Sequence, residues 1–429
     1  MSISALRLLI PILFLVTLYL SQRYWVRSAR RAITAVRHPR WRAALRALWT
    51  ITGLLLLLAV LERFAAFHRT GWPIPRVSRW SSEFLALWFT WSMFGFLAIY
   101  LVRGLDWLGR RSAALVRTRQ PAMSVSDPPV DAGRRYFLRT ATYAAGALPL
   151  AGALYGFAVE RFDFEVFRVE VPLPGLPHGL DGLRILQLSD IHASNYMPIS
   201  QVRRIVDTAQ QLTADLIVST GDLLTGRGDP LAACVAELSR LRAPLGVWGC
   251  NGNHEIYTDT EDEAALLFRQ HGMTMLRQEN AQLAWRGAKF NLIGVDYQRQ
   301  HWFNSQSSQM LEGVEYLVQQ DMLNILLSHN PNAFRRASEI GVDLMLAGHT
   351  HGGQVQVEIL DHRLSPARFI TKYIAGLYRR PMDSDGASAS RDRYASVYVS
   401  RGLGTIGTPL RLGVPPEITL LTLRRARDS

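Results

Sequence analysis

Five short segments of this chain place metal-binding types of side chain at, or a few residues beyond, the end of an apolar run of strand length. Loops at the carboxyl ends of strands in an open α/β sheet converge on one crevice, so residues far apart in the sequence can meet there. Carboxylate and amide oxygens mixed with imidazole suit Mn, Fe or Zn, and the segments supply enough of them for two divalent ions. The pattern therefore predicts an α/β fold with a two-metal site. The segments are Leu188-Ser-Asp190-Ile-His192, Thr220-Gly-Asp222, Gly252-Asn253-His254-Glu255, Ser328-His329-Asn330 and Gly348-His349-Thr350-His351.

From Phe164 onward the chain has the pattern of a soluble α/β domain. Short apolar runs alternate with segments of helical period, which predict helices at Ile199–Leu212, Pro230–Leu241 and Thr260–Gln270. The C-terminal part, Ala395–Leu423, predicts strands separated by Gly and Pro turns. The other predicted strands are Phe164–Val171, Leu183–Leu188, Leu216–Ser219, Val247–Gly249, Phe290–Val295, Ile325–Ser328 and Leu344–Ala347.

The spacing of two between Asp190 and His192 suits an extended segment, because residues i and i+2 of a strand point to the same side. His349 and His351 repeat this spacing. Neutral imidazole and ionised carboxylate can bind a cation near pH 7 with little cost in protons. Both pairs are therefore expected to be extended, so that the two side chains of a pair can face one ion.

The first third of the chain has the composition of a membrane region. Residues 1–140 hold 21 arginines and no lysines against five acids, a net charge of +16, so the remainder of this +13 chain carries −3. Eight of the 11 tryptophans lie there too, as expected for interfacial anchors. Because a span takes roughly 20 residues, we expect an all-α transmembrane region of about four helices in residues 1–160 and a catalytic domain in residues 161–429. The apolar stretches are Leu8–Leu20, Trp49–Leu61, Phe84–Val102 and Ala141–Val159.

The arginine-rich loops predict an orientation. Arg23–Arg46 and Arg103–Arg139 carry eight arginines each, and Arg63–Arg79 between them carries four. The positive-inside rule places the two richer loops in the cytoplasm. Everything after about residue 160 is then expected outside the inner membrane of a Gram-negative cell, in the periplasm. A cleaved signal sequence is the other interpretation of Leu8–Leu20, but no small-residue cleavage site follows it.

Three further segments have a recognisable composition. Gly133–Arg139 reads Gly-Arg-Arg-Tyr-Phe-Leu-Arg and resembles a twin-arginine export signal, here at an internal position; an ordinary cytoplasmic arginine cluster is the other interpretation. Gln120–Gly133 predicts a flexible linker, and Met382–Arg393 predicts a mobile polar loop in the catalytic domain.

The order Asp-x-His, Gly-Asp, Gly-Asn-His-Glu, His, Gly-His-Thr-His resembles the calcineurin-like metallophosphoesterases, over about residues 165–425. The C-terminal segments Ser400–Gly404 and Pro415–Ile418 look most like the membrane-anchored or exported bacterial branch of that family. The resemblance implies a β-sandwich flanked by helices, in α/β/β/α order. It also implies hydrolysis of a phosphoester by two metal ions (Mn, Fe or Zn) and a hydroxide that bridges them.

The resemblance assigns roles to individual residues. Asp222 would bridge the two metals, and His254 would face the scissile phosphate, where it stabilises charge or protonates the leaving oxygen. Glu255 stands where many relatives have Asp and would orient His254. The remaining metal ligands would be Asp190, His192 and His351 for the first ion and Asn253, His329 and His349 for the second.

Two other residues are candidates on position alone. Asn195, three residues after His192, is expected either to hydrogen-bond a phosphate oxygen or metal-bound water, or to cap the helix predicted at Ile199–Leu212. Arg411, near the C-terminal Gly/Pro turns, is expected either to reach an anionic substrate or to be a solvated surface arginine.

These features predict a membrane-anchored phosphohydrolase, a phosphodiesterase whose substrate is lipid-linked because the spans hold the site near the bilayer. One alternative is hydrolysis of the pyrophosphate of UDP-2,3-diacylglucosamine in lipid A synthesis. Another is a catalytically silent membrane binding protein, which would be marked by missing ligands. No nucleic-acid partner is expected, since the chain after residue 140 carries a net charge of −3, and no obligate protein partner is evident.

Overall fold

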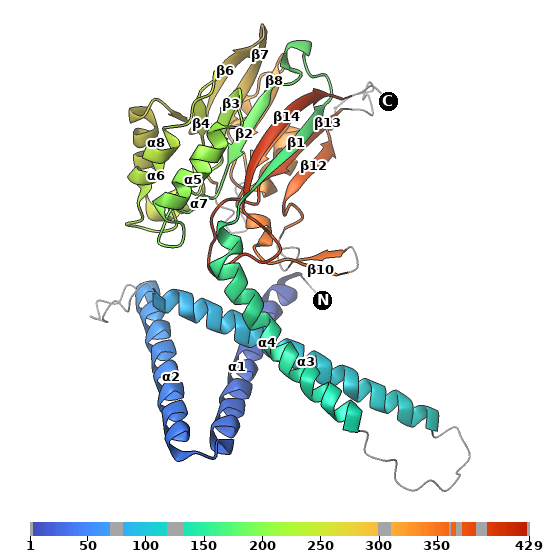
Figure 1. Cartoon of the computed structure of the whole chain (residues 1–429). Helices are drawn as coiled ribbons and strands as arrows, with labels where there is room; N and C mark the ends of the chain where they lie inside the picture. Colours follow the sequence, from blue (N-terminus) through green and yellow to red (C-terminus); the bar gives the residue numbers. More distant parts are fainter. Residues whose placement is uncertain are drawn as a thin grey trace. The chain divides into compact units, whose positions relative to one another are not determined.

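The computed structural model describes residues 3–68, 80–117, 132–298, 310–359, 362–365, 371–382 and 393–426 (Figure 1). Within these residues the chain forms two compact units, Met1–Tyr155 and Gly156–Ser429. The predicted linker Gln120–Gly133, apart from its last two residues, lies outside the described residues. The predicted loop Met382–Arg393 also lies outside them, apart from its two end residues.

Four long helices make up the N-terminal region: α1 (Ile3–Ala35), α2 (Pro39–His68), α3 (Trp80–Arg117) and α4 (Ala132–Ala158). Three segments of the described residues are long and apolar enough to cross a membrane, namely Pro39–Leu61, Phe84–Ser112 and Gly133–Phe162. They contain three of the four predicted stretches. Leu8–Leu20 lies within α1, whose side chains are described only from Ile12 onward. The twin-arginine-like segment forms the first turns of α4.

Polar side chains in these helices bind one another. Gln22 of α1 donates from Nε2 to Ser92 Oγ of α3 at 2.8 Å and accepts from Trp88 Nε1 at 2.9 Å. Trp25 Nε1 donates to the Ser92 carbonyl at 2.7 Å. Such pairing suits an apolar solvent, because a polar group left without a partner in hydrocarbon costs several kcal/mol.

The second unit is built on two six-stranded sheets. The first has the order β1-β14-β2-β3-β4-β5 and the second β12-β13-β9-β8-β7-β6, and a hairpin pairs β10 with β11. The first sheet contains β1 (Glu165–Leu173), β14 (Glu417–Arg425), β2 (Arg184–Leu188), β3 (Leu216–Ser219), β4 (Val247–Gly249) and β5 (Thr274–Met275). The second contains β12 (Gly376–Pro381), β13 (Tyr394–Val399), β9 (Leu344–Ala347), β8 (Leu323–Leu327), β7 (Ala288–Gly294) and β6 (Glu279–Trp285), and the hairpin strands are β10 (Val357–Ile359) and β11 (His362–Leu364).

Alternation along the strands sets the layers, because successive side chains of a strand point to opposite faces. Ile185 of β2 belongs to the core between the two sheets, and the next residue, Leu186, packs with the helices on the outer face. In β9, Leu344 faces the same central core, whereas Met345 packs with α9 on the far side. The result is the α/β/β/α sandwich that the sequence predicts (Figure 1). The helices are α5 (Ile199–Gln210), α6 (Leu231–Leu238), α7 (Asn253–Thr258), α8 (Glu261–Gln270) and α9 (Phe334–Glu339).

The parallel strands bring their carboxyl ends to one edge. In the first sheet β2, β3 and β4 pair in parallel, and in the second sheet β7, β8 and β9 do the same. The predicted strands Leu216–Ser219, Val247–Gly249 and Leu344–Ala347 coincide with β3, β4 and β9. The loops that leave this edge carry all five predicted metal-binding segments.

Candidate metal centre

The strands position the predicted metal ligands at one edge of the sandwich. Asp190 and His192 follow β2, and Asp222 follows β3. Asn253 and His254 begin α7, after β4, and the remaining histidines follow β8 and β9. Three groups of side chains each have one donor atom per residue within 4.8 Å of the others: Asp190, His192 and His351; His192, Asp222 and His254; and Asp222, His329 and His349.

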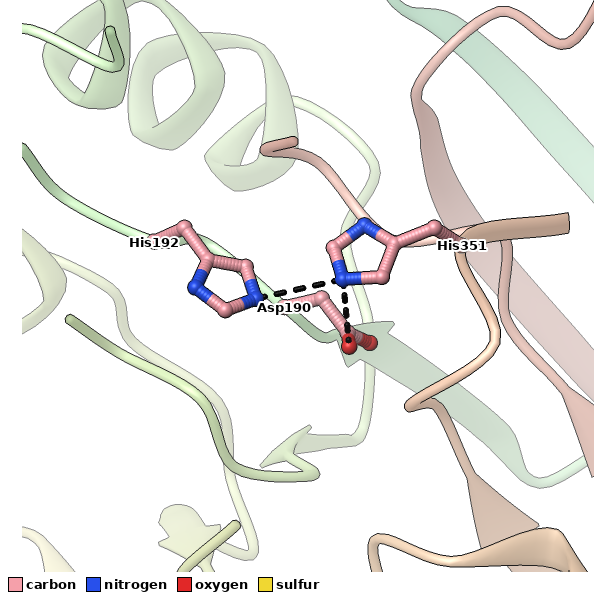
Figure 2. A group of neighbouring side chains, drawn as sticks. All are labelled: Asp190, His192 and His351. Carbon is pink, nitrogen blue, oxygen red and sulfur yellow. Dashed lines mark hydrogen bonds and ion pairs between the residues drawn. The ribbon is translucent and has the colours of Figure 1, made fainter. Parts of the chain in front are cut away.

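The first cluster consists of Asp190, His192 and His351, which point toward one another in Figure 2. The Nε2 atoms of His192 and His351 lie 3.1 Å apart, and His351 Nε2 lies 3.3 Å from Asp190 Oδ1. All three side chains are buried. Two imidazole nitrogens this close, facing one another beside a buried carboxylate, form a donor set that suits a divalent cation.

The second cluster consists of Asn253, His329 and His349. Asn253 Oδ1 lies 2.7 Å from His349 Nδ1 and 3.1 Å from His329 Nε2, and the two histidine nitrogens lie 3.1 Å apart. Asn253 and His329 are buried, whereas His349 is half-buried. An amide oxygen and two imidazole nitrogens converge here, so this cluster also suits a cation.

Asp222 lies between the two clusters. Its Oδ2 is 3.4 Å from His192 Nε2 of the first cluster and 3.1 Å from His329 Nε2 of the second. It belongs to two of the three groups of donors, as His192 also does. The position fits a carboxylate that contacts two neighbouring cations.

Burial sets the protonation of the imidazoles. Desolvation lowers the pKa of His192 to about 3 and that of His349 to about 4, and it lowers the pKa of His351 well below its usual range. Burial also opposes a proton on His329, but the Asp222 and Asp190 carboxylates and the Thr220 carbonyl together outweigh it and raise that pKa to about 10. Three imidazoles therefore offer free nitrogen lone pairs at neutral pH, whereas His329 has to release a proton before it binds a cation.

The backbone at these ligands is left-handed, and the expected extended geometry of the two i, i+2 pairs is wrong. Asp190 and His192 both have φ of 51°, and His349 and His351 have φ of 74° and 51°. Asp222 has φ of 58°. Such conformations cost a non-glycine residue of order 1–3 kcal/mol and persist where the surrounding structure determines them. His349 and His351 consequently turn to different clusters instead of to one side.

Glycines in the motifs allow the carboxylates to approach. A Cβ on Gly252 would lie 2.2 Å from Asp222 Oδ1, and a Cβ on Gly348 would lie 2.0 Å from Ser189 Oγ and 2.2 Å from Asp190 Oδ2. A side chain at Gly252 or Gly348 would collide with the Asp222 or Asp190 carboxylate, so the site requires glycine at both positions.

His254 stands beside the first cluster, with its ring 4.7 Å from that of His192 in an edge-to-face arrangement. Its Nδ1–H donates to the Thr225 carbonyl at 2.6 Å, which leaves Nε2 as the free ring nitrogen. The expectation that Glu255 orients His254 is wrong. The Glu255 carboxylate is buried and accepts instead from the backbone N–H groups of Gly252, Asp222 and Leu223, at 2.7, 2.9 and 2.7 Å, so it holds the Asp222 loop.

The structure contradicts one interpretation of Asn195 and both interpretations of Arg411. Asn195 is exposed on the loop after His192, and the N-cap residue of α5 is Pro198, so the capping interpretation is wrong. Arg411 is fully buried, so it is neither a solvated arginine nor a side chain that can reach a substrate from this position. Its guanidinium binds the carbonyls of Gly404, Gly402, Arg401 and Val414.

Sequence reasoning missed an aromatic wall beside the second cluster. The ring of Tyr297 lies 5.7 Å from that of His349 and 6.1 Å from that of Tyr257, which is itself 6.1 Å from His254. The Tyr297 hydroxyl hydrogen-bonds the side chains of Tyr257 and Asn330, and burial raises its pKa. The signal was available, since Tyr297 lies just beyond the predicted strand Phe290–Val295, in the same position as the metal-binding segments.

The chain is similar to proteins of one family along most of its second unit. Residues 183–353 match the family described as calcineurin-like phosphoesterase. An uncharacterized metallophosphoesterase of Bacillus subtilis is 31% identical over 303 residues, which cover 68% of this chain and 97% of the relative. An uncharacterized metallophosphoesterase of Helicobacter pylori is 27% identical over 382 residues, covering 86% of this chain and 88% of the relative.

A transmembrane protein with a metallophosphoesterase domain from Bos taurus is 32% identical over 271 residues, which cover 61% of this chain and 57% of that protein. The chain thus spans little more than half the length of this relative. The convergent donor clusters, the α/β/β/α sandwich and these similarities together show that the chain belongs to the calcineurin-like phosphoesterase family and is a phosphoric ester hydrolase.

Proposed function

We propose that residues 161–429, which make up nearly all of the second unit, form a catalytic domain that hydrolyses a phosphodiester with two divalent cations. The observation that carries the proposal is the position of Asp222 between two complete donor clusters, 3.4 Å from His192 and 3.1 Å from His329. Asp190, His192 and His351 would hold one ion, and Asn253, His329 and His349 the other, with Asp222 contacting both. Ions held there would polarise a phosphoryl oxygen and lower the pKa of the attacking water.

The chain's own groups then do the remaining work. His254 is half-buried, and the Thr225 carbonyl fixes its ring through Nδ1, so Nε2 is the nitrogen left for the chemistry of the site. A proton on that nitrogen can stabilise the phosphoryl charge or pass to the leaving oxygen. Glu255 holds the backbone of Asp222 and Leu223, which keeps the shared carboxylate in place.

We infer a lipid-linked substrate from the way the chain enters this unit. The candidate span Gly133–Phe162 runs directly into β1, which begins at Glu165, so only a few residues separate apolar helix from catalytic sandwich. With the arginine-rich loops on the cytoplasmic side, a multi-pass anchor in the inner membrane would hold the site on the periplasmic face. A substrate in the same leaflet would be within reach of the site.

The test uses the full chain in detergent micelles. Turnover of bis(p-nitrophenyl) phosphate and p-nitrophenyl phosphate is measured metal-free and after Mn, Zn or Fe is restored, beside Asp222→Asn. Metal-dependent hydrolysis of the diester that is lost in the variant is the expected result. A faster monoester reaction would overturn the diesterase assignment, and two bound ions without hydrolysis of either compound would point to a narrow substrate or a silent binding protein.

A further inference from the structure

Arg411 is a buried cation that the proposed chemistry does not use. Its Nε and Nη2 donate to the Gly404 carbonyl at 3.1 and 2.6 Å. Nη2 also donates to the carbonyls of Arg401 and Gly402, at 2.8 and 3.0 Å. Burial lowers the pKa of Arg411 only to about 10, so the group stays charged at neutral pH. A charged guanidinium that donates hydrogen bonds to several carbonyls of one short loop fixes the conformation of that loop.

The loop that Arg411 fixes, Arg401–Gly404, packs against the first metal cluster. The Gly404 N–H donates to the Asp190 carbonyl at 2.6 Å, and a Cβ on Gly404 would lie 2.8 Å from His192 Cβ. A Cβ on Gly402 would lie 2.6 Å from Asp190 Cβ. The backbone of this loop is therefore the support on which two ligands of the first cluster rest.

The third ligand shares an acceptor with Arg411. His351 Nδ1 lies 3.3 Å from the Gly404 carbonyl, the same oxygen that accepts from Arg411. His351 Nε2 faces Asp190 and His192, so a cation bound to Nε2 would leave the ring proton on Nδ1, beside this carbonyl. Arg411 Nη2 itself lies 3.5 Å from His351 Nδ1. A carbonyl that accepts from the far nitrogen of a metal-binding histidine sets the orientation and basicity of its ring.

The other side of Arg411 meets the end of α4. The Arg411 N–H donates to the Gly156 carbonyl at 3.2 Å, and a Cβ on Gly156 would lie 2.2 Å from the Arg411 carbonyl oxygen. The Glu160 carboxylate accepts from the Val414 N–H at 3.0 Å. Gly156 and Glu160 both fall in the candidate span Gly133–Phe162 and both belong to the second unit.

We propose that Arg411 is a positioning residue for the first metal ion alone, and that the last turn of α4 holds it in place through Gly156. The chain of contacts runs from Gly156 through Arg411 and Gly404 to His351 and Asp190. The second cluster has other supports: His329 Nδ1 donates to the Thr220 carbonyl at 2.7 Å, and Asn253 begins α7. The inference rests on the proposed two-metal site and adds that the end of the span tunes one ion and not the other.

The experiment measures Mn²⁺ binding to the full chain in detergent, by titration and by the electron paramagnetic resonance signal that separates single ions from coupled pairs. Arg411→Lys keeps the positive charge but loses the guanidinium and its several hydrogen bonds. Gly156→Ala places a methyl group against the Arg411 carbonyl. Each variant is expected to weaken one of the two binding steps about 10- to 100-fold, the range typical for groups that orient a metal ligand, and to leave the other step unchanged.

Reference variants identify the affected ion. His351→Ala removes a first-cluster ligand and His349→Ala a second-cluster ligand, so the residual signal of Arg411→Lys should match that of His351→Ala. Gly104→Ala is the matched control for Gly156→Ala, because Gly104 lies in α3 with no atom within 4 Å of a new Cβ. If Arg411→Lys does not fold, Gly156→Ala carries the test.

Each outcome decides the question. Unchanged affinity for both ions in Gly156→Ala and Arg411→Lys would overturn the inference, and so would an equal loss at both ions, which would indicate a general structural role. A wild-type chain that binds fewer than two ions would remove the proposed function itself. A wild-type pair with unaffected variants would remove only this inference.

Discussion

The two candidate donor clusters of this enzyme hold equal numbers of residues in different surroundings. Asp190, His192 and His351 are all buried and rest on the Arg401–Gly404 loop. The second cluster replaces the carboxylate with the amide of Asn253, leaves His349 half-buried and has Tyr297 beside it. The first cluster is thus the better enclosed and the second the more open.

The largest effect is expected from changing Asp222, the carboxylate that lies between the two clusters. Asp222→Asn takes away the charge that both ions would share, and several kcal/mol of lost stabilisation corresponds to about a 1000-fold or greater loss of turnover. Metal content and diester hydrolysis are measured together. Two ions bound at wild-type affinity with activity retained would refute the shared position of Asp222.

The next substitution, at His254, separates metal binding from catalysis. His254→Ala should lower turnover about 100- to 10,000-fold, the usual contribution of a general acid, while both ions stay bound. A ring nitrogen of His254 lies within 4.8 Å of donor atoms of His192 and Asp222. The variant therefore also tests whether His254 binds a metal itself. Loss of an ion from His254→Ala in the titration would make His254 a ligand.

Proton release should distinguish the two clusters. The pKa of His329 is raised to about 10, so its ring is protonated at pH 7 and a cation must displace about one proton there. Binding at the second cluster should strengthen as pH rises from 7 toward 10 and then level off. The first cluster should be flat above pH 7 and weaken below about pH 6, where Asp190, whose pKa burial raises to about 6, takes up a proton.

Calorimetric titration in buffers of different ionisation enthalpy counts the protons directly. His349→Ala disables the second cluster without removing His329, and His351→Ala disables the first. A pH-independent second step, or release of protons from the first step at pH 7, would contradict the difference between the clusters.

The smallest expected effect lies in the aromatic wall. Tyr297→Phe removes the hydroxyl that bonds Tyr257 and Asn330 but keeps the ring beside His349. The free energy of unfolding should fall by about 1 kcal/mol, the net worth of a typical hydrogen bond. Thermal unfolding measures it, with Tyr316→Phe, at an exposed tyrosine, as the control. A loss of several kcal/mol would show that the hydroxyl organises more of the site than its own bonds.

Much of the fold could be read from the pattern of apolar runs. Three predicted strands coincide with β3, β4 and β9, and the predicted helix Thr260–Gln270 differs from α8 by one residue at its start. Buried parallel strands have continuous apolar runs that end in polar loops, so both their bounds and the edge they share are visible in the sequence. Three of the four predicted membrane stretches likewise lie in segments able to cross a bilayer.

The surroundings and hydrogen-bond partners of individual side chains were much harder to predict from the sequence than the fold. Glu255 lies next to His254 in the sequence yet binds the Asp222 loop, because the turn into α7 directs its carboxylate toward three backbone N–H groups. Arg411 stands near Gly and Pro turn residues, where an exposed arginine is expected. In the structure its side chain is fully buried. Neither burial nor partner follows from residue type when the partners come from distant parts of the chain.

The sequence by itself determined which donors the site contains and which strands deliver them, because each donor follows its own apolar run. Only the tertiary structure decided the backbone conformation that directs these donors toward one another. The backbone is left-handed at Asp190, His192, Asp222, His349 and His351, and the side chains of His349 and His351 point to different clusters. Such conformations are unfavourable for an isolated segment and exist only where packing between the two sheets and the C-terminal loops compensates for them.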